Sequence, residues 1–290
     1  MPWPRCFPAL VKLAVCIVSP PGYAHSETFR EIAETVQFAA RALGHDAILT
    51  TRGDLLDRQT IVLGPNLLAR YSMPLARGAI LYNLEQAGSA PWFEPAVLEL
   101  FRRHPVWDYS ERNASNLAAM GLPRPRVVPI GWAPELERIA PASTPDIDVL
   151  FYGSWNERRQ RVLDELRKAG ARVEAVFGVY GAQRDALIAR SRVVLNVHFF
   201  EAKVFEIVRV SYLLGNGRAV VSERGAAPEE EAPFEEAVAF ADYDGLTRAC
   251  LDLLEHDRER ARLSEAGRRV MRARPETAYL KEALWASALA

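Results

Sequence analysis

Residues 194–223, VLNVHFFEAKVFEIVRVSYLLGNGRAVVSE, decide the fold. The apolar run at 193–198 predicts a buried strand, and the apolar spacing after Glu206 predicts a helix that ends at a Gly-Asn-Gly turn. A second apolar strand follows at 219–222. Strand, helix and strand in this order form the repeating unit of a parallel α/β sheet.

The same alternation continues in both directions along the chain. Helices are predicted between the strands, one of them introduced by a capping-box spacing from Thr28 to Glu31 and ended by Gly44, and another running from Asn156 to Gly170. Three helical segments are expected at the end of the chain. Further strands are predicted at 13–19, 47–51, 60–63, 79–83, 106–109 and 127–130, and then at 148–152, 173–177 and 237–241.

The grouping of these elements predicts an α/β protein with two Rossmann-like domains that face a cleft. A proline-rich stretch interrupts the alternation after six strands, so we predict an N-terminal domain over 1–135, a hinge over 136–145 and a C-terminal domain over 146–290. Ligands of open α/β sheets bind at the carboxyl ends of the strands. A cleft between two such sheets is therefore the expected binding site.

Composition excludes several classes of protein. The 290 residues include 36 Lys and Arg against 37 Asp and Glu, and 49% are hydrophobic, which is typical of a folded chain and not of one that coats nucleic acid. Three cysteines without a CxxC pair, and no apolar run of spanning length, favour a reducing, cytoplasmic setting. The proline-rich stretch 1–8 is predicted to be a loose leader, whose Trp3 and Phe7 leave a peripheral membrane contact open.

The segment around Glu206 resembles the carboxy-terminal domain of GT-B glycosyltransferases, particularly the group-1 (family 4) class and its spore-protein-like relatives. In that class two glutamates, seven residues apart, flank the start of a helix that faces the nucleotide sugar. Glu206 matches the second glutamate, whereas His198 stands at the position of the first and Glu201 is displaced from it. The resemblance implies that Glu206 holds the ribose, and it makes His198 a candidate catalytic contact to the donor sugar. The resemblance is clearest over residues 146–274. Over residues 10–135 it rests mostly on the alternation of predicted strands and helices.

A second segment, 151–159, occupies the turn in which that class binds the diphosphate of the donor. Gly153 matches the family glycine, Ser154 replaces a basic residue, and Arg158 or Arg159 falls at the next basic position. Arginine near a helix N-terminus suits a phosphate group. Together with a further cation, Lys203, this turn is expected to hold the diphosphate. The predicted donor-binding residues are Gly153, Ser154, Arg158, Arg159, Lys203, Glu206 and Arg209.

The N-terminal half is expected to bind the acceptor, because in GT-B enzymes the loop after the first strand borders the reacting sugar. His25 and Glu27 in this loop are candidate catalytic bases or polar contacts. The loop has a single glycine, so dinucleotide binding of the dehydrogenase type has little support. The predicted cleft residues of this half are Gly22, Tyr23, Glu85 and Asp108.

The resemblance implies a metal-independent glycosyltransferase that needs no cofactor and takes a nucleotide-diphosphate sugar as donor. The Asp-x-Asp triplets at 146–148 and 242–244 are expected to be structural, with Asp244 as a helix N-cap. The acceptor (saccharide, lipid, protein or natural product) and the oligomeric state stay open, and no nucleic acid is expected. Two alternatives are a sugar-nucleotide epimerase and a non-catalytic nucleotide-sugar-binding protein, the latter favoured by His198 and Ser154.

Overall fold

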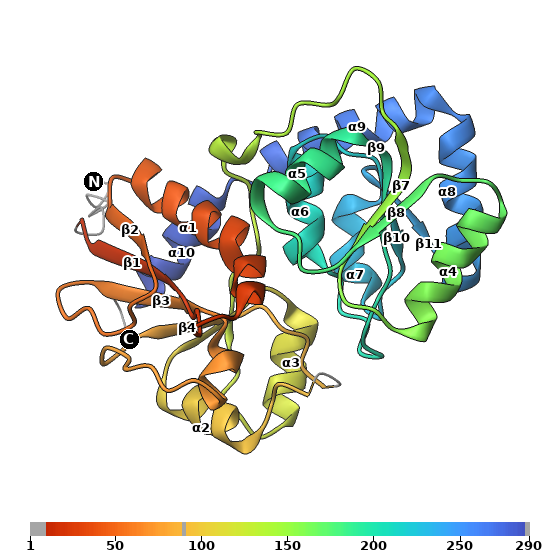
Figure 1. Ribbon diagram of the computed structural model, residues 1–290. Coiled ribbons are helices and arrows are strands. Elements are labelled where there is room, and N and C mark those ends of the chain that lie inside the picture. The colour runs from red at the N-terminus through yellow and green to blue at the C-terminus, as the bar shows by residue number, and fades with distance from the viewer. Residues whose placement is uncertain (1–9, 89–90, 288–290) are drawn as a thin grey trace.

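Two parallel β-sheets organise the computed structural model, which describes residues 10–88 and 91–287 (Figure 1). The first sheet has six strands in the order β2-β1-β3-β4-β5-β6, and the second has five in the order β11-β10-β9-β7-β8. Their bounds are β1 Lys12–Ile17, β2 Asp46–Thr50, β3 Gln59–Leu63, β4 Ile80–Asn83, β5 Val106–Asp108, β6 Arg126–Val127, β7 Ile147–Tyr152, β8 Val173–Val176, β9 Ser191–Asn196, β10 Val220–Glu223 and β11 Val238–Ala241. This arrangement confirms the predicted α/β class with two facing Rossmann-like sheets.

Helices cover both faces of each sheet and connect the parallel strands (Figure 1). The central strands are therefore buried on two sides, which explains their unbroken apolar runs: Leu13 to Val18 is buried throughout. The helices are α1 Arg30–Ala42, α2 Pro95–Arg103, α3 Glu111–Ala119, α4 Glu157–Lys168, α5 Gly181–Arg190, α6 Ile207–Gly215, α7 Pro228–Glu231, α8 Leu246–Glu255, α9 Asp257–Arg272 and α10 Glu276–Ser287. No helix within the described ranges is long and apolar enough to cross a membrane.

Two predicted helix starts differ from the structure. A 3-10 helix at Ala24–Phe29 precedes α1, which begins at Arg30, so the capping box predicted from Thr28 does not form. Asp244 lies inside another 3-10 turn, and Gly245 occupies the N-cap of α8. In both places a preceding 3-10 turn satisfies the backbone donors that a capping side chain would otherwise bind. The predicted leader at 1–8, with Trp3 and Phe7, lies outside the described residues.

The final helix returns to the first half of the molecule. Figure 1 shows α10 beside α1, and the backbone of Trp132 holds its start by pairing with Arg274 and Glu276. One hydrophobic core continues across both halves and includes Ile32 of α1, Leu214 of α6 and Leu280 of α10. The two sheets are thus joined by a shared core as well as by the connecting chain.

The segment predicted to be a hinge, 136–145, is fastened to the second sheet's layer of helices. Asn216, which follows α6, accepts hydrogen bonds from the backbone N–H groups of Arg138 and Ile139 at 2.9 and 2.8 Å and donates to the carbonyl of Leu136 at 2.9 Å. A single asparagine side chain can satisfy three backbone groups in this way because it carries both an acceptor and two donors.

The first Asp-x-Asp triplet has ionic partners, and the second lies at a helix start. Asp146 pairs with Arg190, and Asp148 pairs with Arg172 at 2.8 Å at the start of β7. Asp242 takes the N-cap position of the turn that precedes α8. Within the described residues, no group of three or more His, Cys, Asp or Glu side chains is arranged to hold a metal ion.

Candidate active site

A cavity of about 590 Å³ lies between the carboxyl ends of the two sheets. Its walls are the loops that follow β1, β3, β4 and β5 on one side and β7, β8 and β9 on the other, together with the start of α6. This is the position at which a parallel α/β sheet offers loops and helix N-termini to a ligand. We call the first side the N-wall and the second side the C-wall.

The cavity brings together about half of the residues that the sequence points to. The other predicted site residues pack behind the cavity wall or lie on the surface. The predicted residues that line the cavity are Tyr23, His25, Glu85, Gly153, Ser154, Arg159, Glu206 and Arg209. Those that do not line it are Gly22, Glu27, Asp108, Arg158, His198 and Lys203.

Glu206 is the N-cap residue of α6 and faces the C-wall of the cavity. Its carboxylate lies 3.4 Å from the guanidinium groups of both Arg159 and Arg209. Burial raises the pKa of Glu206, but Arg209 and Arg159 outweigh burial, and the pKa lies below its ordinary value. The side chain is therefore an ionised acceptor at neutral pH, able to take hydrogen bonds from ligand hydroxyls.

Gly153 ends β7 and brings the backbone close to two cations. Its φ of 151° belongs to the region that favours glycine, and a Cβ at this position would stand 3.2 Å from Arg209 and 3.3 Å from Arg159. Arg159 is almost wholly buried, and its guanidinium N–H groups donate to the carbonyls of Val197 and Ser154. Burial lowers the pKa of Arg159 to about 10. Arg209 makes one weaker bond, at 3.3 Å to Asn196, and keeps donors for the cavity.

Arg158 and Lys203 differ from their predicted place in the donor site. Both pair with Glu223 at the end of β10, Lys203 at 2.9 Å, and Arg158 also stacks on the ring of Tyr243. Glu223 is buried, and an unpaired carboxylate there would be costly, so it attracts the nearest cations. The predicted patch of four cations therefore reduces to Arg159 and Arg209 at the cavity.

His198 also lies behind the cavity wall. Its ring is 1% exposed, neither ring nitrogen has a hydrogen-bond partner, and Nδ1 is 3.7 Å from the Glu206 carboxylate. Burial lowers the pKa of His198, so the ring is neutral. Contact with a donor sugar, as predicted from its place in the sequence, would require the ring to move.

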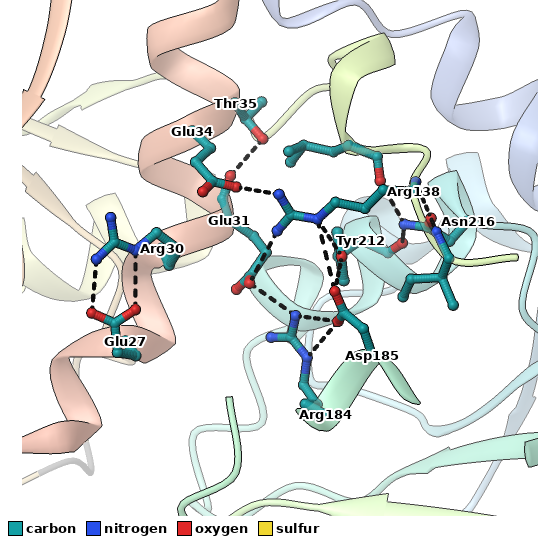
Figure 2. Close-up of polar contacts among 12 residues, drawn as sticks. Glu27, Arg30, Glu31, Glu34, Thr35, Arg138, Arg184, Asp185, Tyr212 and Asn216 are labelled. Carbon is teal, nitrogen blue, oxygen red and sulfur yellow. Dashed lines mark hydrogen bonds and ion pairs between the residues drawn. The ribbon is translucent and has the colours of Figure 1, made fainter. Parts of the chain in front are cut away.

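Three predicted N-terminal residues are held away from the cavity. Glu27 forms a two-pronged ion pair with Arg30 one turn later (Figure 2), which removes it as a catalytic base. Gly22 is an exposed turn residue. Asp108 is fully buried under the loops, where Asn83, Asn113 and the N–H of Ser110 donate to it. Its role is to order those loops.

The N-wall contributes an aromatic contact across the cleft and a carboxyl group, Glu85, that has no cation partner among the described residues. His25 Nδ1 lies 2.6 Å from the hydroxyl of Tyr180, and its ring stacks against Phe177 of the same C-wall loop. Glu85 follows β4, and its carboxylate has a hydrogen bond of 3.5 Å from Asn66. Burial, assisted by Glu206, raises the pKa of Glu85 to about 7.

Several lining residues were not singled out from the sequence. Arg184 lies in α5 and pairs with Glu31 of α1 at 2.8 Å, and it resembled any helix-surface arginine in the sequence. The aromatic side chains Phe177 and Tyr180 sit in the loop after β8, a position that the rule about strand ends could have identified. Trp92 follows no strand directly, and no local signal marks it.

The two facing sheets define a GT-B-type architecture, and comparison of sequences gives the family. The sequence model of the family described as "Glycosyl transferase-like" matches residues 135–283, just over half of the chain. The chain belongs to this family. Two uncharacterized proteins of Acanthamoeba polyphaga mimivirus are similar, at 32% identity over 113 residues and 25% over 185 residues. The matches cover 38% and 61% of this chain but 13% and 59% of those proteins.

Solved structures share the fold at low sequence identity. AviGT4, a glycosyltransferase involved in avilamycin A biosynthesis, superimposes with a TM-score of 0.54 at 14% identity, over 94% of this chain and 96% of that chain. WaaG, a glycosyltransferase of lipopolysaccharide biosynthesis, gives 0.57 at 12% identity over 93% and 98%. Anabaena Alr3699/HepE in complex with UDP-glucose gives 0.58 at 12% identity over 96% and 99%. These likenesses confirm the GT-B architecture.

Proposed function

We propose that this protein is a glycosyltransferase that moves a sugar from a nucleotide-diphosphate donor to a hydroxyl acceptor without a metal ion. The observation that carries the proposal is the position of Glu206. It is ionised, it caps the helix that opens onto the cavity, and it stands between Arg159 and Arg209. Family membership over 135–283 supports the same assignment.

The C-wall holds the donor in this proposal. Glu206 accepts hydrogen bonds from the two ribose hydroxyls, a pairing that one ionised carboxylate makes well. Arg209 binds the diphosphate, and Arg159 adds positive charge from behind it. Gly153 lets the phosphate groups approach the backbone because it carries no side chain. The UDP-glucose bound to Anabaena HepE makes UDP the first nucleotide to try.

The reaction then needs charge stabilisation and a proton acceptor. The acceptor oxygen forms a bond to the anomeric carbon, the bond from that carbon to the diphosphate breaks, and the electron pair leaves with the diphosphate. Arg209 and Arg159 stabilise the added charge, which is the role that fixed cations serve in leaving-group departure. His25 and Glu85 line the same cavity, and we propose them as the groups that take up the hydroxyl proton.

Calorimetry with UDP, GDP and dTDP tests the donor site. We expect one of the three to bind, and Glu206→Ala to weaken that nucleotide by about tenfold or more, since hydrogen bonds to a charged group contribute about 1.5–3 kcal/mol. Glu201→Ala is the matched control, an exposed glutamate of the same segment that does not line the cavity. Failure of all three nucleotides to bind folded protein would contradict the proposal.

A non-catalytic nucleotide-sugar-binding role is the second candidate. The observation that favours it is His198, a buried neutral ring at the position where the glycosyltransferases it resembles carry a glutamate. Tight nucleotide binding without release of nucleoside diphosphate from any sugar donor would support this role over transfer.

A further inference from the structure

The N-wall faces the donor site, so it is the surface that an acceptor would touch if the proposed function holds. The groups assigned to the donor, Glu206, Arg209 and Gly153, all belong to the C-wall. The chemistry of the opposite wall therefore selects the acceptor.

The charge on the N-wall is negative only. Among the described residues, its charged lining side chains are Glu31 and Glu85, and no lysine or arginine from this half lines the cavity. Arg184 compensates Glu31 at 2.8 Å. The carboxylate of Glu85 has no cation partner among the described residues, and its one hydrogen bond there is the long contact from Asn66. An anionic acceptor would meet a like charge with no counter-charge on its own side.

The carboxylate of Glu85 is the charged acceptor that this wall offers without a cation partner among the described residues. Asn66 is buried, and its Oδ1 has no hydrogen-bond partner. Its amide nitrogen donates to Glu85 at 3.5 Å, so the carboxylate of Glu85 is the acceptor that this pair of residues presents to the cavity. Buried acceptors of this kind are satisfied by hydroxyl donors. Tyr23, Trp92 and Tyr109 line the same wall and present apolar faces beside these acceptors.

We propose that the acceptor is an uncharged glycoside, whose hydroxyl groups donate to Glu85 while an apolar face lies against the aromatic side chains of the N-wall. The proposal rests on the proposed function, because it takes the C-wall as the donor site. Phosphorylated sugars and phospholipid headgroups would meet the ionised form of Glu85 with no counter-charge from the N-wall, so we expect them to bind more weakly than the neutral glycoside.

The test compares two probes on protein saturated with UDP: phenyl β-D-glucopyranoside and the same compound carrying a 6-phosphate. NMR titration gives a dissociation constant for each. We expect the neutral glycoside to bind at least tenfold more tightly than its phosphate. Glu85→Gln should weaken the neutral glycoside by about tenfold, in line with a hydrogen bond to a charged group, without weakening UDP. Glu99→Gln, an exposed glutamate of α2, is the control and should change neither.

Each outcome is decisive for one of the two claims. Equal or tighter binding of the phosphate, or unchanged glycoside binding by Glu85→Gln, would overturn the acceptor proposal. UDP binding with no binding of either glycoside would overturn it as well and leave the donor site intact. If UDP does not bind, the same titrations are run on protein saturated with GDP or dTDP, and failure of all three nucleotides to bind would instead mark the failure of the proposed function.

Discussion

Glu206 shows how one side chain acquires its state from its neighbours. Burial alone would favour the protonated carboxyl, but two guanidinium groups at 3.4 Å hold it ionised. The neighbouring Glu85 has no such cations, and its pKa rises to about 7. Two carboxyl groups of one cavity are thus kept in different states, one suited to accepting hydrogen bonds and the other to exchanging a proton.

Arg209→Gln tests the diphosphate site at the residue scale. We expect UDP to bind about 10- to 100-fold more weakly, because a charge-assisted contact to phosphate is lost, whereas uridine, which makes no phosphate contact, should be weakened less. Calorimetry with the two ligands separates the phosphate contribution from the ribose contribution. Arg161→Gln, an exposed arginine of α4, serves as the control. Equal weakening of uridine and UDP would contradict the assignment.

Glu276 links stability to pH. Its carboxyl is buried and accepts a hydrogen bond from the N–H of Gly131 at 2.6 Å, and burial raises its pKa to about 8. A raised acid pKa contributes stability that is full below the unfolded-state pKa near 4.5 and is lost as the pH rises through about 8. Glu276→Gln removes that titration. Between pH 5 and pH 9 we expect the free energy of unfolding of the variant to rise by roughly 1–3 kcal/mol relative to that of the wild type. Urea unfolding at each pH measures this difference. A difference in unfolding free energy between the two proteins that does not change with pH would contradict the raised pKa of Glu276.

At the scale of elements, a cluster of charges ties α1 to α5, α6 and the 136–145 segment (Figure 2). Glu31 of α1 accepts from Arg184 at 2.8 Å, and Glu34 accepts from Arg138 at 2.8 Å. Tyr212 of α6 accepts from Arg138 and donates to Asp185. Because Glu31 and Arg184 are both buried, removing one partner leaves the other with a single ionic contact, Glu31 with Arg138 at 3.6 Å or Arg184 with Asp185 at 2.7 Å.

A double-mutant cycle measures this contact between the halves. Arg184→Met should destabilise the protein by about 3–5 kcal/mol, since the carboxylate of Glu31 stays buried with only Arg138 near it. Adding Glu31→Gln should recover part of the loss, and the coupling free energy should exceed 1 kcal/mol. The readout is urea unfolding of the two single variants and the double variant. Additive effects would show that the pair does not couple.

The local elements could be predicted from the sequence, but their tertiary partners could not. Apolar runs identify the strands within about two residues because the parallel sheets are buried on both faces. Glu206 could be assigned to the cavity because its segment resembles the GT-B class, in which this helix start faces the nucleotide sugar. Arg158 and Lys203 could not be excluded from it, because the residue that captures them, Glu223, comes from a strand 20 or more residues later in the chain. The burial of His198 and Asp108 could not be predicted for the same reason, since it depends on the packing of distant segments above them.

At the scale of the whole molecule, the two sheets form one cavity with chemically different walls. The shared core and α10 hold the halves together, and the pairs His25–Tyr180 and Glu31–Arg184 join the walls at the cavity itself. The formal net charge of −1 averages over the two walls, so it does not reveal that they differ in charge. Cations line the C-wall, whereas the N-wall offers carboxylates, an amide oxygen and aromatic faces.

The central claim is transfer of a sugar from a nucleotide-diphosphate donor, and ³¹P NMR of UDP-, GDP- and dTDP-sugars incubated with the protein tests it most directly. We predict that signals of a free nucleoside diphosphate grow from one donor, faster when phenyl β-D-glucopyranoside is present, and that Arg209→Gln abolishes the growth. Persistence of every donor in the presence of folded, nucleotide-binding protein would contradict the claim. Conversion of one donor into an isomeric nucleotide sugar without release of diphosphate would also contradict it and would establish an epimerase.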